Sequence, residues 1–383
     1  MRADTISGAD LRGAVISAIF GSALALAGCS GSVETMPGMG GSGGTGGTPA
    51  CTASCEATIE GWSTASTLLT ARRDHATFIV DTPAGAFLYV AGGASTTAWT
   101  SGVADVERAE IHADGSVGPF SVVATLPGLS TQAGAVQAGR TVLLIGGRDS
   151  ISLPDVYVGT VADDGSIGFT MGPPLGVARQ ELAAVAHGGF VYAIGGIHVD
   201  YDPETQVTVW TYEDVIERAP FDGTTLGPFE MAAPLAQPLA SHAAAVANDS
   251  LYVLGGQTSG STDPTPDVQR APLGQDGTVG VFGWAGAFVN GRTKTAAFAL
   301  SGSMFAIGGA GQAGGDRVLR APLHEDGTMG AFAEMTPLPG QREVRQAPVH
   351  GNFVYVAGGA LDQDGDPAPQ PEVFVGKIVV QAP

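Results

Sequence analysis

Four arginines recur at one position of a repeated segment. Among the side chains of this chain, their type and spacing point most directly to ligand binding or catalysis. Two repeats carry a histidine three residues beyond this position, and a third carries Glu181 two residues beyond it. A guanidinium binds a carboxylate through two parallel hydrogen bonds, and a neighbouring glutamate or histidine can move a proton. The alternative, which we favour, is that the arginines bond loop carbonyls and hold neighbouring repeats together. The arginines are Arg72, Arg179, Arg292 and Arg342, and the histidines are His75 and His242.

No other catalytic or metal-binding pattern accompanies this set. The 383 residues contain neither the GxSxG motif of serine hydrolases nor the phosphate-binding GxxxxGK[ST] loop. The remaining histidines stand singly, without metal-ligand spacing. Asp362, Asp364 and Asp366 resemble the start of a calcium loop, but its twelfth position is Val373 instead of Glu, which favours an ordinary acidic loop. The sequence therefore predicts no catalytic residue, no metal and no cofactor.

The elements that must position these residues are six short apolar runs, each ending in a glycine pair. They read FLYVAGG, VLLIGG, VYAIGG, LYVLGG, MFAIGG and VYVAGG, and their last glycines are Gly93, Gly147, Gly196, Gly256, Gly309 and Gly359. Runs of this length, rich in β-branched and aromatic residues and apolar on both faces, are typical of buried strands. Five Asp-Gly turns alternate with them, at Asp114, Asp164, Asp222, Asp276 and Asp326. Asp-Gly between apolar segments predicts a hairpin, because a type I′ turn needs positive φ at both central residues.

The spacing of these signatures predicts four strands in each repeat, here called A to D. A phenylalanine after each Asp-Gly turn lies 27 residues before the last glycine of the next pair, whereas the distance from a glycine pair to the next Asp-Gly turn varies from 18 to 27 residues. Length variation is therefore confined to the B–C loop. The phenylalanines are Phe120, Phe169, Phe229, Phe282 and Phe332.

A glycine pair that closes strand B, with an aromatic residue in strand D, resembles the kelch repeat, as in the propeller of galactose oxidase. The resemblance covers about 320 residues and implies an all-β fold, a six-bladed β-propeller. Two features depart from the family pattern: most repeats lack the usual strand C tyrosine, and strand D carries Phe where kelch repeats often have Trp. A copper radical site like that of galactose oxidase is excluded, because it needs a Cys cross-linked to a Tyr and residues 57–383 contain no Cys.

The two ends of the repeat region predict that the propeller is closed. There are six strand B signatures but five Asp-Gly hairpins, so the last repeat has strand C, at 372–379, without a strand D. At the other end, Trp62 lies in an orphan segment ahead of the first strand A. We expect this N-terminal strand to pair with the last blade, because an open sheet edge is a liability that closure removes.

The variable B–C loops share one face with the entrances to strand A, and they predict a binding surface on a rigid scaffold. Seven cations lie at these entrances and should ring the mouth of the central channel on that face: the four repeated arginines, Arg73, Lys294 and Arg345. Tolerated sequence drift is the alternative explanation of their variation. Aromatic residues in these loops are the best candidates for ligand contact, although the VTVWTY stretch at 207–212 would bury them if it extended a hairpin. These candidates are Trp99, Tyr201 and Trp210.

The first 28 residues have the pattern of a signal peptide, with an apolar stretch at 14–27 that is too short to span a bilayer. The segment ends in Leu-Ala-Gly-Cys, which resembles a bacterial lipobox. This resemblance implies that Cys29 is acylated, and Ser30 after it implies sorting to the outer membrane, on its periplasmic or surface side. A conventional signal peptide with a chance Cys is the alternative. Residues 29–56 then form a Gly-rich tether, and residues 57–383 form the propeller.

Cys51 and Cys55 are the remaining cysteines once Cys29 is lipidated. Export implies an oxidising compartment, so we expect them to form a disulfide across a tight turn. A zinc site would need two further ligands, and none is visible nearby.

The formal net charge of −20 disfavours nucleic acid and anionic membranes as partners. We therefore expect a monomeric, membrane-tethered, non-catalytic module that binds a protein or glycan through its B–C loop face. The alternative is an enzyme acting on an anionic sugar, because exported six-bladed kelch proteins include a sialic acid mutarotase. A structural envelope component is a third possibility.

Overall fold

The computed structural model describes residues 56–98, 102–202, 204–261, 263–311, 314–363 and 366–381. The predicted signal peptide, most of the tether, Cys29, Cys51, Cys55 and Trp99 lie outside these residues. The described residues form strands joined by turns and loops, and among them there is no helix of the length and hydropathy that crossing a membrane requires.

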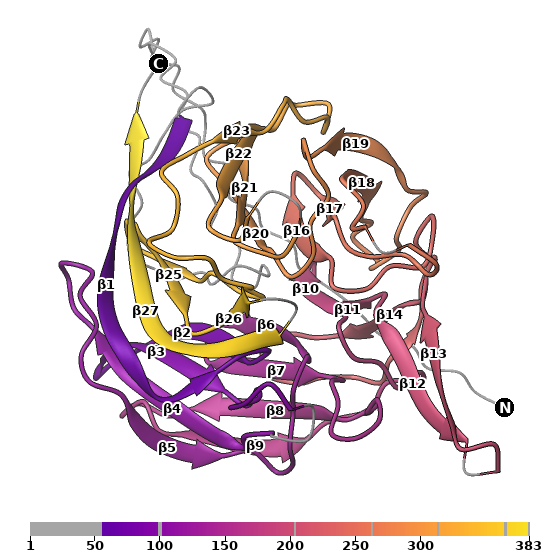
Figure 1. Cartoon of the computed structure of the whole chain (residues 1–383), viewed down its shortest axis with the longest axis horizontal. Coiled ribbons are helices and arrows are strands. Elements are labelled where there is room, and N and C mark those ends of the chain that lie inside the picture. The colour runs from indigo at the N-terminus through magenta and orange to yellow at the C-terminus, as the bar shows by residue number, and fades with distance from the viewer. Residues whose placement is uncertain are drawn as a thin grey trace, which may run out of the picture. The chain divides into compact units, whose positions relative to one another are not determined.

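The described strands build the predicted six-bladed β-propeller, in which each blade is an antiparallel sheet of four strands in the order A to D (Figure 1). The first blade contains β2 (Ala76–Thr82), β3 (Gly85–Ala91), β4 (Asp105–Ile111) and β5 (Ser121–Thr125); the second β6 (Gly134–Ala138), β7 (Thr141–Ile145), β8 (Val156–Val161) and β9 (Ile167–Met171); the third β10 (Ala183–His187), β11 (Phe190–Ile194), β14 (Ile216–Pro220) and β15 (Glu230–Met231). The fourth contains β16 (Ala243–Ala247), β17 (Ser250–Leu254), β18 (Asp267–Pro272) and β19 (Gly283–Ala287); the fifth β20 (Ala296–Leu300), β21 (Ser303–Ile307), β22 (Val318–Pro322) and β23 (Ala333–Glu334); the sixth β24 (Val349–His350), β25 (Phe353–Ala357), β27 (Asp366–Gln381) and β1 (Glu56–Arg72).

The predicted closure is confirmed, because the outermost strand of the sixth blade comes from the other end of the chain. β1 pairs antiparallel with β27, from Glu56 opposite Gln381 through Trp62 opposite Gly376 to Arg72 opposite Gln370. The two strands run side by side in Figure 1, one at the start of the colour bar and the other at its end. The Trp62 indole N–H also donates to the Thr336 carbonyl oxygen (3.0 Å), which connects this strand to the fifth blade.

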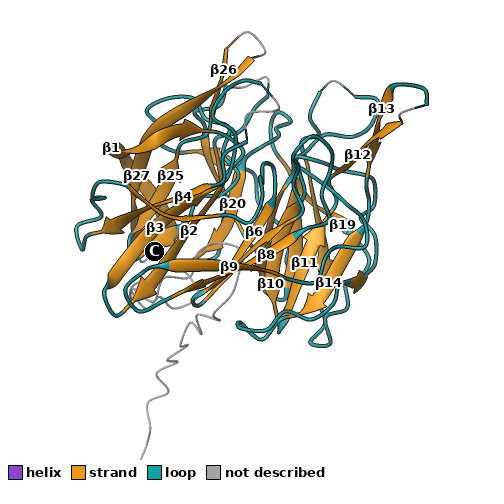
Figure 2. Ribbon diagram, turned by 90° about the horizontal axis from the view of Figure 1, so that it is seen from below, coloured by secondary structure: helices purple, strands orange, loops and turns teal. Residues whose placement is uncertain are grey.

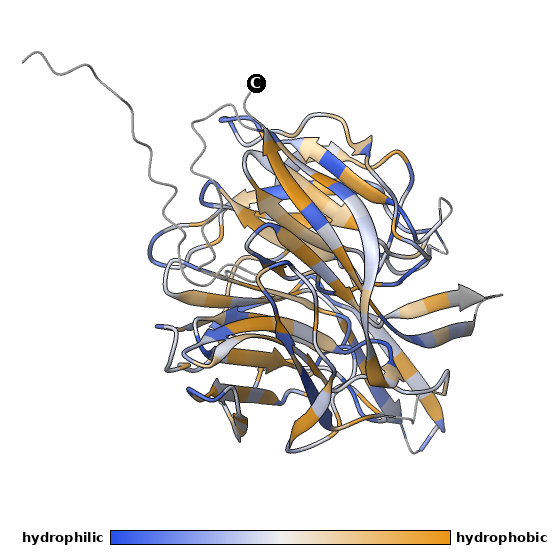
Figure 3. Ribbon diagram, turned by 90° about the vertical axis from the view of Figure 1, so that its left-hand side faces the viewer, coloured by the Kyte–Doolittle hydropathy of each residue, from blue (hydrophilic) through white to orange (hydrophobic). Residues whose placement is uncertain are grey.

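Six hydrophobic clusters among the described residues make up the core of the ring, and each is formed by two adjacent blades. In the first of them, Tyr89 and Phe78 of the first blade pack with Val142 and Leu144 of the second. The same arrangement recurs around the ring, up to the cluster in which Ile59 of β1 packs with Phe305 of the fifth blade. Hydrophobic residues are concentrated on the strands, and the connecting loops are more hydrophilic (Figure 3). Burial between blades therefore holds the ring together.

The glycine pairs make close backbone contacts between blades. Gly92 and Gly93 both have positive φ (67° and 91°), and a Cβ on Gly92 would lie 2.5 Å from the carbonyl oxygen of Ser130 in the second blade. The Gly93 N–H donates to that same oxygen (2.9 Å). Equivalent hydrogen bonds of 2.7–2.9 Å follow every other pair, donated by Gly147, Gly196, Gly256, Gly309 and Gly359. A side chain on the first glycine would therefore push the next blade away.

A second contact between blades uses the Asp-Gly turns. The Tyr89 hydroxyl donates to the Gly165 carbonyl oxygen (2.6 Å) in the next blade, and Arg108 donates to the adjacent Asp164 carbonyl oxygen (3.0 Å). The third and fourth blades repeat the arginine contact through Arg218 and Arg270, and Arg320 of the fifth blade pairs with Glu56 of β1, where the Asp-Gly turn is missing. These strand C arginines therefore fasten the next blade and are not merely solvated at the rim.

The second blade carries Leu143 and Val158 at the positions of this Tyr–Arg pair. A hollow of about 560 Å³ lies between the second and third blades, lined among others by Arg140, Thr160 and Phe221.

Replacing Ile59 by Ala is expected to destabilise the protein by about 2–5 kcal/mol, because the side chain is 1% exposed in the core between the fifth and sixth blades. Urea unfolding measures this loss. Leu69→Ala, on the same strand but 62% exposed, is the matched control and should change stability by less than about 0.5 kcal/mol. Equal, small effects at both positions would contradict the closing role of β1.

Candidate functional site

The B–C loop face carries two hairpins that project from the propeller. β12 (Ile197–Asp202) pairs with β13 (Val207–Tyr212) in the third blade, and β26 (Ala360–Gln363) pairs with the first part of β27 in the sixth. Figure 2 shows both hairpins extending to the same side of the molecule. The VTVWTY stretch thus forms the second strand of a hairpin, as one sequence interpretation proposed, but the burial of its aromatic residues that this interpretation expected does not occur.

The base of the β12–β13 hairpin is fixed to the propeller. Ile197 and Val199 are buried against Ala240 of the fourth blade. The Val199 N–H donates to the Ser152 Oγ (2.8 Å), and that hydroxyl donates to the Ile197 carbonyl oxygen (3.1 Å). The loops of three successive blades therefore hold the hairpin in place.

The outer part of this hairpin exposes large apolar side chains. Tyr201 and Trp210 are 48% and 53% exposed. They lie on one face of the hairpin, because Trp210 is opposite Val199 and Tyr201 is two residues further along the same strand. Val207 and Val209 are about half exposed on the other face. An exposed aromatic pair on a fixed support is typical of a ligand-contact surface.

The four arginines of the repeat position are buried inside their own blades. Arg72 donates to the Gly92 and Asp105 carbonyl oxygens (3.1 and 2.9 Å) and forms an ion pair with Glu107. Arg179 pairs in the same way with Glu217 (2.9 Å).

The other two arginines each lie near an aromatic ring. Arg342 pairs with Glu372 (2.7 Å) and lies over Phe374, while Arg292 donates to the Gly308 carbonyl oxygen (2.8 Å) beside Phe288. Burial lowers the pKa of Arg292 to about 10, so its guanidinium remains charged at neutral pH. The geometry of all four side chains supports a structural role.

His75 and His242 fill equivalent positions between neighbouring glycine pairs. The His75 Nε2 lies 2.9 Å from the Ala357 carbonyl oxygen of the sixth blade. The His242 ring lies against Gly195 of the third blade, so closely that a Cβ added to Gly195 would lie 2.8 Å from the ring. Burial lowers the pKa of His75 to about 4, helped by nearby Arg72, and that of His242 to about 3, helped by nearby Arg345. Both imidazoles are therefore neutral at neutral pH.

A ring of residues two positions beyond the arginine position surrounds the entrance of the central channel, and we call it the channel-mouth ring. Each member from Gln132 onward donates its backbone N–H to the carbonyl oxygen of the preceding member, over 2.8–2.9 Å. The members before the last have positive φ, between 50° and 59°. The ring consists of Asp74, Gln132, Glu181, Ser241, Lys294 and Val344.

The side chains of this ring form a charged network. The Glu181 carboxylate accepts hydrogen bonds from Gln132 Nε2 (2.7 Å) and from the Ser241 hydroxyl. Lys294 pairs with Glu343 (2.9 Å), and Asp74 pairs with Arg345 (3.1 Å). Burial disfavours the charged form of Asp74. The positive charges of Lys294, Arg345 and Arg73 nevertheless hold the pKa of Asp74 well below its usual range. The pKa of Lys294 is raised because Asp74, Glu343 and Glu181 outweigh its burial.

Sequence reasoning singled out Glu181 and placed Lys294 and Arg345 at the channel mouth, but it did not connect them with Asp74, Gln132 and Ser241 in one network. A signal was present: the second position after the repeated arginine is polar in five of six repeats, just before strand A becomes apolar. The described residues hold no group of three His, Cys, Asp or Glu side chains arranged for a metal ion.

The two neutral histidines make stability depend on pH. Their folded-state pKa values lie below the unfolded value of about 6.5, so their contribution is complete above pH 6.5 and is lost as the pH falls through 4. In this pH window each histidine lowers the free energy of unfolding by on the order of 1 kcal/mol per pH unit as the pH falls. The double variant His75→Gln, His242→Gln should flatten the slope in urea unfolding between pH 4 and 6.5. An unchanged difference between wild type and variant across this range would contradict the assignment.

Comparisons with known proteins agree with this fold. No protein-family model matches the chain. The kelch repeat and BTB domain-containing protein 12 of Danio rerio is 32% identical over 142 residues, which is 36% of this chain. The chain spans 21% of the length of that relative. The solved structure of YjhT superposes with a TM-score of 0.60 at 14% identity, over 82% of this chain and 99% of YjhT. Six glycine-paired repeats and the closed ring make this chain a six-bladed β-propeller, and these similarities are to a kelch-repeat protein and to a solved structure of the same fold.

Proposed function

We propose that this propeller is a non-catalytic binding module whose B–C loop face contacts a protein or glycan through the β12–β13 hairpin. The observation that carries the proposal is the exposure of Tyr201 and Trp210 on a hairpin whose base is buried in the propeller. Aromatic side chains bring large apolar contact area with few rotatable bonds, and they pack equally well on sugar rings and in protein pockets.

The hairpin also carries acidic residues around its aromatic pair. Asp200, Asp202 and Glu204 lie at or near its tip, and the Asp202 carboxylate accepts hydrogen bonds from the turn at Glu204 and Thr205. An acidic border around exposed aromatic residues disfavours anionic surfaces and favours neutral or basic ligands.

Replacing both Tyr201 and Trp210 by Ser should raise the apparent Kd of a bound glycan or protein by at least about tenfold, because central aromatic contacts carry much of the binding energy. A glycan array and a binding assay against separated envelope proteins, run in parallel, identify the ligand and measure this loss. Trp284→Ser is the matched control, because Trp284 is 73% exposed on the outer strand β19 of the fourth blade. If the wild type, the double variant and Trp284→Ser bound the ligand equally well, the hairpin would not be part of the binding surface.

The sugar-acting alternative receives less support from the geometry. In it, the repeated arginines hold the carboxylate of the substrate and Glu181 or a histidine moves a proton. The guanidinium groups of Arg72, Arg179, Arg292 and Arg342 instead face carboxylates, backbone carbonyls and aromatic rings of their own blades. Glu181 already accepts two side-chain hydrogen bonds in the channel-mouth ring.

We also propose that the module acts as a monomer attached to the outer membrane by a lipid on Cys29. The support is the lipobox-like segment and the Gly-rich stretch before the propeller. Growth with an alkyne-labelled fatty acid should label the wild-type chain, and Cys29→Ser should abolish the label and release the protein from the membrane fraction. Labelling that persists in Cys29→Ser would contradict the anchor.

A further inference from the structure

The central channel contains a pocket of about 80 Å³ just inside the channel-mouth ring, and we call it the channel pocket. This volume holds several water molecules. Strand A or its entrance contributes to the wall in all six blades, from Thr77 in the first to Pro348 in the sixth. No residue of the β12–β13 hairpin lines the pocket, so the two features are separate.

The charges that line the channel pocket are all positive. Among the described residues around it, only Lys294 and Arg345 carry a formal charge near neutral pH, and neither Asp nor Glu is present. The carboxylates that pair with these two cations, Glu343 and Asp74, are not part of this wall.

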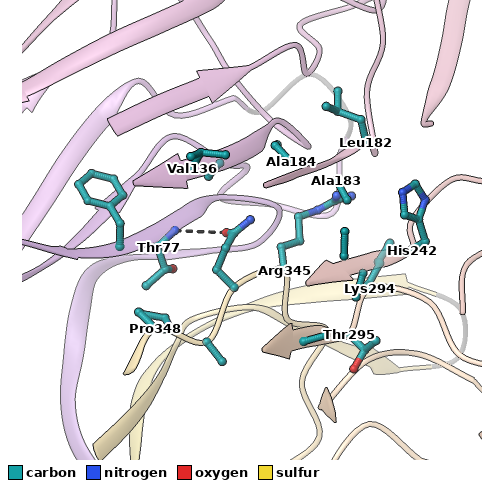
Figure 4. A pocket seen from close by; sticks show the side chains of 18 of the residues that line it. Thr77, Val136, Leu182, Ala183, Ala184, His242, Lys294, Thr295, Arg345 and Pro348 are labelled. Atoms are coloured by element: carbon teal, nitrogen blue, oxygen red, sulfur yellow. Dashed lines mark hydrogen bonds between the residues drawn. The ribbon is translucent and has the colours of Figure 1, made fainter. Parts of the chain in front are cut away.

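Arg345 has hydrogen-bonding capacity left inside the fold. Its side chain is 9% exposed, and its Nε donates to Asp74 (3.1 Å). Its buried Nη2 has no hydrogen-bond partner among the described residues. Figure 4 shows the Arg345 side chain extending into the space enclosed by the labelled residues. A buried guanidinium nitrogen without an acceptor is costly unless a ligand or water satisfies it.

Beside polar residues such as Thr77, Ser241 and Gln346, the wall has an apolar part made of small side chains. Ala183, Ala184, Ala243 and Ala244 face the channel together with Val136 and Leu182. The Gln137 Oε1, a further polar atom in the wall, is buried without a partner. A fork of guanidinium donors beside an apolar wall matches a carboxylate carrying a short hydrocarbon part, whereas inorganic phosphate would require donors on all sides.

We propose that the channel pocket binds a small organic acid, with its carboxylate on Arg345 beside Lys294 and its apolar part against the alanine wall. The site differs from the buried repeat arginines, because Arg345 lies three positions beyond Arg342. It also does not depend on the proposed binding face, since no hairpin residue lines it.

Propionate is the probe for this site, added to the purified full-length chain at constant ionic strength set with sodium chloride. Thermal unfolding should show a saturable rise in Tm with propionate, because a ligand of the folded state stabilises it by mass action. Chloride alone should not produce this rise. Isothermal titration then gives the Kd for each variant.

Two variants distinguish the site from a general salt effect. Arg345→Gln should raise the Kd by at least about tenfold, because it removes a charge-assisted pair. Ala244→Leu should fill the pocket, keep every charge and abolish binding. The controls are Arg140→Gln, an exposed arginine outside the pocket, and Ala162→Leu, an exposed position in an Asp-Gly turn. Both controls should bind propionate like the wild type.

The proposal is overturned by an unsaturable response, by an equal response to chloride, or by an unchanged Kd in Ala244→Leu. If Arg345→Gln fails to fold because Asp74 loses its partner, Ala244→Leu against Ala162→Leu decides the question. Loss of propionate binding leaves glycan or protein binding at the hairpin intact, so failure of one proposal is distinguishable from failure of the other.

Discussion

The close approach of neighbouring blades at the glycine pairs is the constraint on which the rest of this structure depends. Each pair accepts no side chain at its first glycine and donates a hydrogen bond from its second to a carbonyl oxygen of the next blade. That carbonyl belongs to the repeat position of the four arginines, whose side chains bond their own blade. Each of these arginines thus connects two blades. Its backbone carbonyl oxygen accepts the hydrogen bond from the preceding glycine pair, and its side chain bonds the blade whose strand A it precedes. The spacing of the six blades, and with it the width of the channel, follows from this contact.

The architecture was predictable because its signals are local and repeated. Glycine pairs and Asp-Gly turns constrain backbone angles directly, and the missing last hairpin together with Trp62 indicated the closing strand. The charged network at the channel mouth was predictable only in part: its cations at the strand A entrances were visible in the sequence, whereas the ion pairs join segments that are distant in sequence and meet only after the ring closes. The arginine position showed the same limit: its repetition was visible, but the partners Glu107 and Glu217 became evident only through strand pairing.

Two separate features remain for function once the structural residues are accounted for. The β12–β13 hairpin presents apolar surface outward, where a large ligand can reach it. The channel pocket presents positively charged side chains inward, and its volume admits only a small ligand. The hairpin is an insertion in one B–C loop, whereas the pocket uses every blade. Change in the loop therefore alters the outer surface without disturbing the channel, which is the usual advantage of a rigid scaffold with variable loops.

The unequal fastening of the blades has a mechanical consequence. Five boundaries have a tyrosine or arginine contact to the turn or strand of the following blade, but the second blade offers Leu143 and Val158 to the third. The hollow beside Arg140 lies at this same boundary. A toroid under thermal stress separates where its joints are weakest. We therefore expect the ring to open first at the seam between the second and third blades.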